Sequence, residues 1–495
     1  MRSDLLPAYE FDFSPGLTVP TGQVWRRMHA VGANDVVDDT FGYRFDDRFL
    51  HRTLGTVLSP AIADMLDSAI AAFVADRVAL RCIKGSRQWH RDITIRIPVR
   101  QPKLWLDDRF GKELAGFLTY LTDDSWSVEF VPRSAASRRS EQDAALFTPL
   151  GRPAAVSVLH SGGLDSCLGI VSAAQSYRRQ VIVAVSAVSH SHQRIVQSRV
   201  LDSLRRMLPA EIVWARIPLN LRGVPRREQE SSQRTRGLLY LTAGAIGAIL
   251  AGAHVLEVSE TGIGAINLPC APEQLGTHTT RSMHPLTLAR FERLLTLFLG
   301  LPFTVVNTSI WKTKTESCRA SINQAGSDLH HLLVAMQATV SCDRFPWVGL
   351  REACGSCTSC LFRRMSLHAA SLAGIEVAGP RRYAFDPKSF EANWAAHDHV
   401  PIYALRSHVE RLHAAMEAEH PYMALVQEFP ALTRLYQAAE HLQLSDGELE
   451  AHIVRLFRAF VTEWREFEQA IRWPASHAQQ SVVPIDQAVA AAIAS

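Results

Sequence analysis

Residues 161–166, with the sequence SGGLDS, have the composition of a phosphate-binding loop. They follow an apolar stretch typical of a buried strand and precede one typical of a helix. Two glycines allow backbone conformations in which N–H groups point at one anion, and the next helix turns its positive end toward the same place. Asp165 would repel a phosphate unless Mg²⁺ lies between them, which favours metal-bound pyrophosphate. The loop is not of the Walker type, because the GxxxxGK[ST] pattern is absent from the sequence.

A second group of residues has the spacing of a metal site. Cys342 is followed by Cys354, Cys357 and Cys360, so two CxxC steps share one cysteine. Four thiolates at this spacing suit a closed tetrahedral zinc site, and an iron–sulfur cluster is the alternative. A site closed by four thiolates leaves no position for a substrate, so we expect a structural role.

Composition limits the function classes further. The chain has 495 residues, 52 Lys and Arg against 49 Asp and Glu, and a net charge of +3. This near balance argues against a large sequence-independent contact with nucleic acid. Eight cysteines are too few for a disulfide-rich secreted scaffold, and the first residues lack a signal-peptide run. We therefore expect a cytoplasmic protein.

The pattern along the chain predicts three regions: an α+β accessory domain over 1–150, a catalytic domain over 151–378, and a helical domain over 379–495 that begins near Pro380 and Pro387. Ser59-Pro60 should start a helix, as cap and first residue. In the middle region short apolar strands alternate with helices, which indicates an α/β fold with a doubly wound parallel sheet. Its strands are expected at 154–159, 181–188, 211–217, 254–258 and 303–306. Residues 237–256 have the length of a membrane span, but we interpret them as a buried helix running into a strand.

SGGLDS resembles the signature of the PP-loop ATP pyrophosphatases, which adenylate a carbonyl or carboxylate oxygen and release pyrophosphate. The loop together with C…CGSCTSCLFRR resembles the 7-cyano-7-deazaguanine synthase (QueC) family, with Arg363 at the trailing arginine position. The resemblance implies an adenine nucleotide α-hydrolase-like core and the ligands ATP, Mg²⁺ and Zn²⁺. It implies zinc ligation by the four cysteines and catalysis by Asp165, Ser166 and Lys314 (in WKTKTE). It implies ATP binding by Ser161, Gly162, Gly163, Leu164, Asp165, Ser166 and Arg236.

The segment 257–285, EVSETGIGAINLPCAPEQLGTHTTRSMHP, departs from that family because the usual acidic pair is missing. Its pattern is similar to the QueC-like proteins of bacterial anti-phage systems, QatC and the QueC-like component of some cyclic-nucleotide defence operons. Within it, Glu260 is suited to reading the amino edge of a guanine-like ring and Arg281 to holding a carboxylate. The expected substrate-binding residues are Glu260, Asn267, Arg281 and His284.

We therefore expect a ligase that adenylates 7-carboxy-7-deazaguanine and passes the acyl group to an amine, giving an amide conjugate with a protein partner in defence. The alternatives are a nitrile-forming synthase that uses ammonia in queuosine biosynthesis, a tRNA-modifying enzyme, and a non-catalytic scaffold. Cys167 is expected to pack in the core, and His190 and His192 are weaker candidates for a general base. The flanking regions are expected to bind a protein partner, with self-association as the alternative role.

Overall fold

The computed structural model describes most of the chain. The described residues are 7–14, 21–29, 36–81, 89–105, 108–134, 138–142, 150–221, 224, 228–270, 280–345, 349–350, 352–378, 382–389, 394 and 399–474. The expected break at Pro380, three arginines of the long loop after residue 220 (Arg222, Arg226 and Arg227) and residues 475–495 lie outside them.

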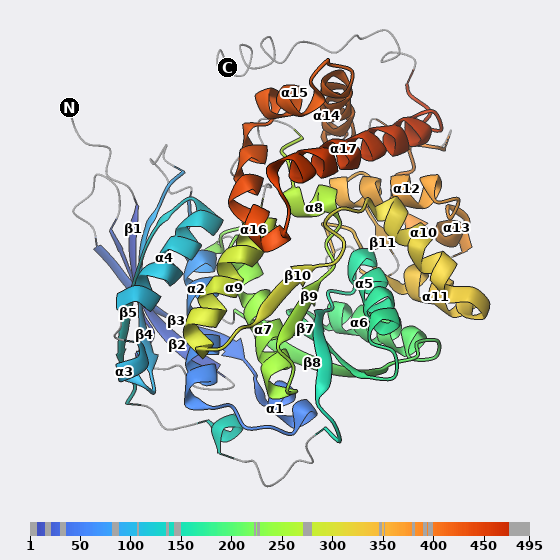
Figure 1. The fold of residues 1–495 in the computed structure, drawn as a ribbon. Helices are drawn as coiled ribbons and strands as arrows, with labels where there is room; N and C mark the ends of the chain where they lie inside the picture. The colour runs from blue at the N-terminus through green and yellow to red at the C-terminus, as the bar shows by residue number, and fades with distance from the viewer. Residues whose placement is uncertain are drawn as a thin grey trace, which may run out of the picture.

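The molecule is built on a mostly parallel ten-stranded sheet with the order β10-β9-β6-β7-β8-β3-β2-β1-β4-β5 (Figure 1). Five strands at one end are mutually parallel: β6 (Ala154–Leu159), β7 (Val181–Val188), β8 (Glu211–Asn220), β9 (Val255–Val258) and β10 (Thr304–Asn307). Their bounds agree with the expected strands to within a few residues, which confirms the α/β class. The chain moves from β6 outward to β8, then returns to add β9 and β10 on the other side of β6. The order therefore reverses between β6 and β9, where open α/β sheets bind ligands.

Both faces of this parallel part are covered by helices. Along β7, Ile182 and Ala184 pack in one apolar core, while Val181, Val183 and Val185 pack in another. The first core contains α5 (Leu164–Ser176), α6 (Ser191–Leu204), α10 (Lys314–Ala325) and α11 (Leu329–Ala338). The second contains α7 (Arg236–Leu250), α9 (Pro285–Leu299), α2 (Pro60–Val78) and α4 (Asp108–Thr122). This explains why the strands are apolar throughout, because residues on both sides are buried.

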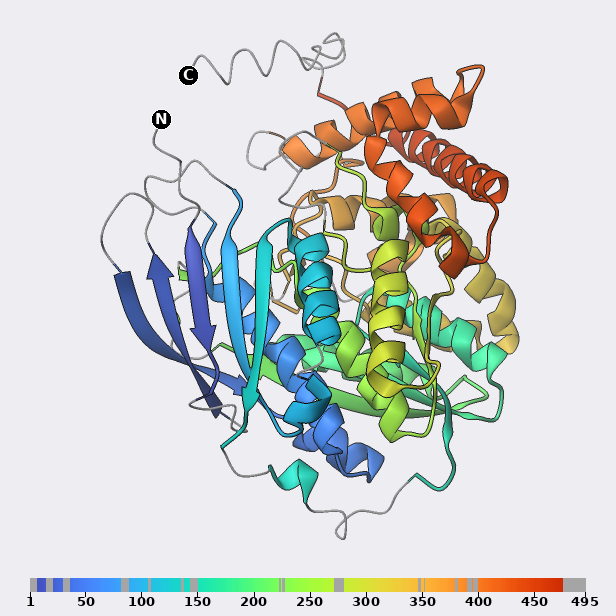
Figure 2. The same ribbon diagram turned by 60° about the vertical axis from the view of Figure 1, so that its left-hand side comes forward.

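The N-terminal region extends the same sheet (Figure 2). Its strands are β1 (Ala8–Asp12), β2 (Thr21–His29), β3 (Val36–Phe45), β4 (Asp92–Val99) and β5 (Ser125–Pro132), with α1 (Arg48–Leu54) and α3 (Pro102–Trp105) among them. Strand β3 joins β8 antiparallel through Arg44–Asn220 and Phe45–Leu219. Ser59 caps α2, its hydroxyl accepting from Ile62 N–H at 3.3 Å, as the sequence predicts. Residues on both sides of the expected boundary at 150 thus share a sheet and an apolar core.

The C-terminal helical unit, residues 399–474, comprises α14 (Val400–Met416), α15 (Pro421–Glu428), α16 (Ala439–Leu442) and α17 (Asp446–Glu468). Between α15 and α17 the chain forms a 3-10 helix, Pro430–Ala438, followed by the short α16. In Figure 1 the unit lies over α8 (Gly262–Ile266) and α12 (Thr358–Ala369), and its core includes residues from both. The remaining described elements are α13 (Gly374–Ala378), the paired strands β11 (Glu352–Ala353) and β12 (Arg382–Tyr383), and two short 3-10 helices, Arg139–Glu141 and Gly326–Asp328. Within the described residues, every helix is too short or too polar to cross a bilayer.

Candidate functional site

The candidate site lies at the carboxyl end of the parallel strands, where the strand order reverses. Residues 161–166 follow β6, Glu260 follows β9 and Lys314 follows β10. The turns after β9 and β10 are joined by two hydrogen bonds: Asn307 Nδ2–H donates to the Glu260 carbonyl at 2.8 Å, and Gly262 N–H to the Lys312 carbonyl at 3.0 Å. Three segments distant in sequence thus converge on one place.

The loop itself is held in a defined conformation. Gly162 has φ +87°, in the left-handed region that residues with a Cβ rarely adopt. Its carbonyl accepts from Val340 N–H at 3.0 Å, and Gly163 then caps α5. The Ser161 hydroxyl accepts from Gly163 N–H at 3.2 Å and lies 3.2 Å from the Ser166 hydroxyl. Since the first N–H groups of a helix have no partner within it, the start of α5 can bind an anion here.

Asp165, Glu260 and Lys314 form what we call the carboxylate–lysine cluster. The Lys314 ammonium donates to Asp165 Oδ2, and both side chains are only 14% exposed. The Glu260 carboxyl interacts with both of them. The buried Oδ1 of Asp165 has no N–H or ammonium donor among the described residues. The cluster therefore has two carboxyl groups and one ammonium group, and Asp165 Oδ1 receives no hydrogen bond from that ammonium group.

This imbalance shifts the protonation of the cluster. Burial raises the pKa of Glu260 to about 7, the Asp165 charge adds to the rise, and Lys314 opposes it. Burial acts to lower the pKa of Lys314, but Asp165 and Glu260 outweigh it and raise that pKa above its ordinary value. Near neutral pH the lysine is therefore charged while Glu260 is close to its titration point. A divalent cation between the two carboxyl groups would restore the balance, and oxygen ligands with α5 alongside suit Mg²⁺ with phosphate.

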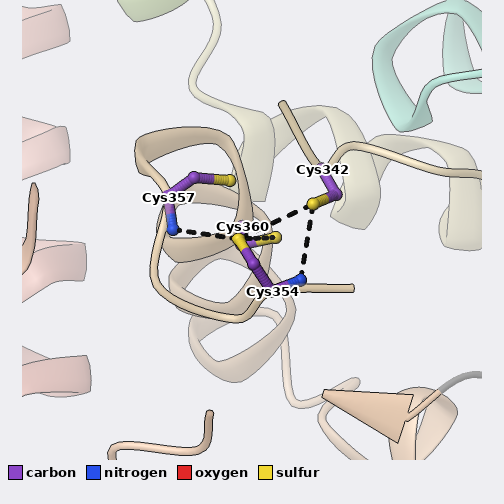
Figure 3. Close-up of side chains that lie close together, drawn as sticks. All are labelled: Cys342, Cys354, Cys357 and Cys360. Atoms are coloured by element: carbon purple, nitrogen blue, oxygen red, sulfur yellow. Dashed lines mark hydrogen bonds between the residues drawn. The ribbon is translucent and has the colours of Figure 1, made fainter. Parts of the chain in front are cut away.

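The four predicted cysteines lie together, as Figure 3 shows. Their sulfur atoms are all within 4.8 Å of one another. The Sγ atom of Cys354 lies 3.6 Å from the Sγ atom of Cys342 and 3.9 Å from that of Cys360. Four sulfurs at about 2.3 Å from a tetrahedral zinc ion are about 3.8 Å apart. The cluster of four cysteines therefore fits a metal ion such as zinc.

The backbone around the cysteine cluster is shaped for thiolates. Asp343 N–H donates to Cys357 Sγ at 3.4 Å, and Cys357 N–H donates to Cys354 Sγ at 3.3 Å. The neighbouring thiols, Cys342 first among them, hold the pKa of Cys354 below its ordinary range by donating to its sulfur. Gly355 has φ +79°, and a Cβ there would lie 2.0 Å from the Phe385 carbonyl, so the turn requires glycine. These features stabilise negative sulfur, the form that binds metal.

Two neighbouring residues, Val340 and Thr339, connect the cysteine cluster to the loop at 161–166. Val340, which donates to the Gly162 carbonyl, lies two positions before Cys342. The next side chain back, Thr339, accepts from buried Arg363 Nη1 at 2.6 Å, and Arg363 follows Cys360 in α12. The trailing arginine thus braces the link between the cysteine cluster and the loop, and its Nε donates to Glu376 at 2.6 Å.

The other predicted substrate residues lie in different surroundings. Asn267, with φ +50°, ends α8 and donates from Nδ2 to the Thr280 carbonyl at 3.0 Å. Arg281 stacks on Tyr120 and pairs with Asp123 at 2.9 Å. His284 caps α9, its Nδ1 accepting from Leu286 N–H at 3.1 Å, and burial lowers the pKa of His284 to about 3. In this structure these three side chains support the segment after β9, and only Glu260 of the four joins the carboxylate–lysine cluster.

The remaining candidates are also located. Arg236 is exposed at the first residue of α7 and lies over its own Tyr240 at 5.7 Å. Cys167 is fully buried, and burial raises the pKa of Cys167 to about 12, so it packs in the core as expected. His190 caps α6 with its ring, which accepts from His192 N–H at 3.1 Å.

Sequence reasoning missed two features of the site. The loop before α7 is anchored to the N-terminal region, since Glu230 N–H donates to the Arg77 carbonyl at 2.7 Å and Thr235 N–H to Asp76 at 3.0 Å. Glu463 of α17 accepts from the Thr313 hydroxyl, immediately before Lys314. The only hint in the sequence is a glutamate at position 463, on the apolar side of a long helix beside Trp464.

Comparison with known protein families finds no family model that matches the chain, and comparison with curated proteins finds no match either.

Proposed function

We propose that the protein is an ATP-dependent ligase that adenylates a deazapurine carboxylate, 7-carboxy-7-deazaguanine, and transfers the acyl group to an amine. The observation that carries the proposal is the convergence of Asp165, Glu260 and Lys314 beneath a glycine-containing loop at the reversal of strand order. Two carboxyl groups, one ammonium group and a helix N-terminus make a suitable environment for magnesium-bound triphosphate. The resemblance of SGGLDS to the PP-loop ATP pyrophosphatases supports the same reaction and the same core fold.

In the proposed reaction, a carboxylate oxygen of the substrate attacks the α-phosphorus of ATP, and the bond to the β-phosphate oxygen breaks. The chain's part is to hold the leaving pyrophosphate, through the N–H groups that begin α5 and the hydroxyls of Ser161 and Ser166. The Lys314 ammonium neutralises the charge that builds up there. Asp165 and Glu260 would hold Mg²⁺, which supplies further positive charge beside the phosphates.

In the second half-reaction an amine attacks the acyl carbon of the adenylate, AMP leaves, and the amine gives up a proton. The described residues that surround the carboxylate–lysine cluster include no thiol of lowered pKa, since Cys318 beside Lys314 is buried and its pKa is raised to about 12. The proposal therefore needs no covalent intermediate on the protein. We place the amine on a protein partner, in a cytoplasmic anti-phage system, by resemblance alone. Ammonia is the alternative: it gives the primary amide, and a second ATP activates the amide oxygen, which leaves on AMP to give the nitrile.

Mass spectrometry tests the proposal. The protein is incubated with 7-carboxy-7-deazaguanine, ATP, Mg²⁺ and either ammonia or a candidate partner protein encoded beside it. Pyrophosphate release that depends on the substrate supports adenylation, and its absence with both amines contradicts it. A mass gain on the partner that disappears in Asp165→Ala selects conjugation, whereas amide or nitrile formation with ammonia alone selects the metabolic alternative.

A further inference from the structure

One side of α17 lies against two of the three segments that carry the carboxylate–lysine cluster, the turns after β9 and β10. Glu463 is 6% exposed and accepts from the Thr313 hydroxyl. About two turns earlier, Leu456 fills the space over Gly262, and about three turns earlier, His452 stacks on Trp311 at 4.9 Å between ring centres. Arg455 pairs with Glu316 at 2.6 Å. Positions 452, 455, 456 and 463 share one side of a helix, so this is a continuous contact of α17 with the turns after β9 and β10.

Thr313 connects α17 to the lysine. It is the N-cap of α10: its hydroxyl accepts from Glu316 N–H at 3.1 Å, and Glu316 accepts in return from Thr313 N–H at 2.8 Å. The same hydroxyl donates its hydrogen to Glu463, so both of its hydrogen-bonding functions are used. Lys314 is the next residue, the first of α10. A shift of the cap would therefore move the ammonium group relative to Asp165.

Charged groups from two helices, α10 and α17, meet at the N-terminus of α10. An ammonium group at a helix N-terminus is at the unfavourable end of the helix dipole. Glu316 within α10 and Glu463 from α17 place two carboxyl groups at the same end, where negative charge is favourable, although burial raises the pKa of Glu463 to about 7. Only the second of these comes from outside the catalytic segment. It is also the one with a direct hydrogen bond to the side chain of the cap residue.

We infer that Glu463 is a positioning residue: through the Thr313 hydroxyl it holds the start of α10 so that Lys314 meets Asp165 and the departing pyrophosphate. The C-terminal helical unit is thus part of the catalytic machinery and not an appended module. The effect on catalysis rests on the proposed function. The effect on the position of α10 rests on the Glu463–Thr313 hydrogen bond.

The kinetic test compares Glu463→Ala with Glu463→Gln in the full chain, using substrate-dependent pyrophosphate release. The alanine variant is expected to lower kcat about tenfold, because a small displacement of a catalytic group is costly, with KM for ATP changed less than about twofold. Glutamine keeps an oxygen that accepts from Thr313, so it should recover most of the rate. Glu466→Ala, exposed on the same helix, is the matched control and should behave as wild type.

A double-mutant cycle locates the effect at the cap. Thr313→Val removes the helix cap as well as the Glu463 contact, so it should lower kcat at least as much as Glu463→Ala. Adding Glu463→Ala to Thr313→Val should cost little more, because the contact is already lost. Additive losses, or equal losses in the alanine and glutamine variants, would show that Glu463 acts only through general stability and would overturn the inference.

A second measurement separates this inference from the proposed function. Amide hydrogen exchange of the full chain, without ATP or substrate, is followed in a peptide covering residues 311–318 and in one covering α5. Glu463→Ala should speed exchange in the first peptide and leave the second unchanged, with Glu463→Gln near wild type. If the wild type releases no pyrophosphate but exchange responds in this way, only the proposed function fails. An unchanged 311–318 peptide in Glu463→Ala contradicts the positioning role, whatever the activity.

Discussion

Two clusters of charged side chains, both mostly removed from water, are built on opposite principles. In the N-terminal region Asp76, Arg81, Arg91 and Asp124 are fully buried and form an arginine–aspartate network with ion pairs of 2.6–2.7 Å. Every carboxylate oxygen there accepts a hydrogen bond, Asp76 Oδ2 from Thr235 and Asp124 Oδ1 from Arg91 N–H. In the carboxylate–lysine cluster two carboxyl groups share one ammonium group, and Asp165 Oδ1 has no N–H donor within the described residues.

The difference in charge balance indicates a structural role for the arginine–aspartate network and a ligand-binding role for the carboxylate–lysine cluster. Burial acts to raise the pKa of Asp76, but Arg91 outweighs it and holds that pKa below its ordinary value. Burial raises the pKa of Glu260 to about 7, and the single Lys314 does not outweigh it. A balanced network favours one charge state and fixes backbone segments, here the loop before α7 against α2. An unbalanced one is suited to binding a charged ligand, because the ligand supplies the missing charge.

The cysteine cluster is a third group of buried polar side chains. Removing a metal from it should lower both stability and pyrophosphate release, and more than any substitution below. Without the metal the cysteines take up protons and no longer cross-link the segment, so Val340 would lose its fixed position against the loop at 161–166. Chelation is expected to cost several kcal/mol of unfolding free energy and to abolish pyrophosphate release. Metal analysis should find about one zinc per colourless chain, whereas iron with visible absorbance would overturn the zinc assignment.

The balanced network is tested by Asp124→Asn, which leaves two buried arginines with one carboxylate. We expect a loss of about 3–5 kcal/mol of unfolding free energy, measured by denaturant titration. Its neighbour Asp123 is 44% exposed and pairs with Arg281 and Arg234, so Asp123→Asn should cost less than about 1 kcal/mol. Equal losses at the two positions would remove the distinction between the clusters.

An aspartate-to-asparagine substitution in the carboxylate–lysine cluster should lower activity strongly and change stability little. Asp165→Asn is expected to lower substrate-dependent pyrophosphate release about a hundredfold or more, a transition-state cost of about 3 kcal/mol. Its unfolding free energy should stay within about 1 kcal/mol of wild type, because the change removes one of two like charges and Lys314 still faces Glu260. A variant that is destabilised as much as Asp124→Asn would place Asp165 among the structural residues.

The smallest effect is the pH dependence that Glu260 gives to stability. Its pKa is about 7 in the folded chain and about 4.5 as an ordinary glutamate. A raised carboxyl pKa contributes stability below pH 4.5, and the contribution is lost as pH rises through 7. Glu260→Gln imitates the protonated form, so without metal it should be more stable than wild type at pH 8 by on the order of 1 kcal/mol and close to wild type at pH 4. Mg²⁺ should narrow the gap at pH 8, and a pH-independent difference would argue against the shifted pKa.

The strand–loop–helix at 154–176 was predictable because its signals are local: an apolar run, two glycines and a helix start. The cysteines were predictable from spacing alone. Strands β2 and β3, which join the two parallel sets through three antiparallel pairings, were not predicted, since β3 (VVDDTFGYRF) carries Asp38 and Asp39, which disrupt its alternation. Those aspartates pair across strands with Arg27 and Arg26, a compensation that only the register reveals.

The site was predictable only in part, for the same reason. The sequence singled out the segment after β9 and Glu260 within it as substrate-binding, which stays a prediction. It did not predict that the Glu260 side chain lies against Asp165 and Lys314. The position depends on the Asn307–Glu260 hydrogen bond, between residues 47 apart in sequence. The contact of α17 with Thr313 spans 150 residues and has no local signal at all.

The most direct test of the central claim uses 7-carboxy-7-deazaguanine labelled with a heavy oxygen isotope in its carboxylate. The wild-type protein is incubated with this substrate, ATP, Mg²⁺ and an amine, and the AMP is analysed by mass spectrometry. If the carboxylate attacks the α-phosphorus at the carboxylate–lysine cluster, one heavy oxygen passes into AMP, and Asp165→Asn prevents it. AMP that forms with no label, or label transfer that survives Asp165→Asn, would contradict the account.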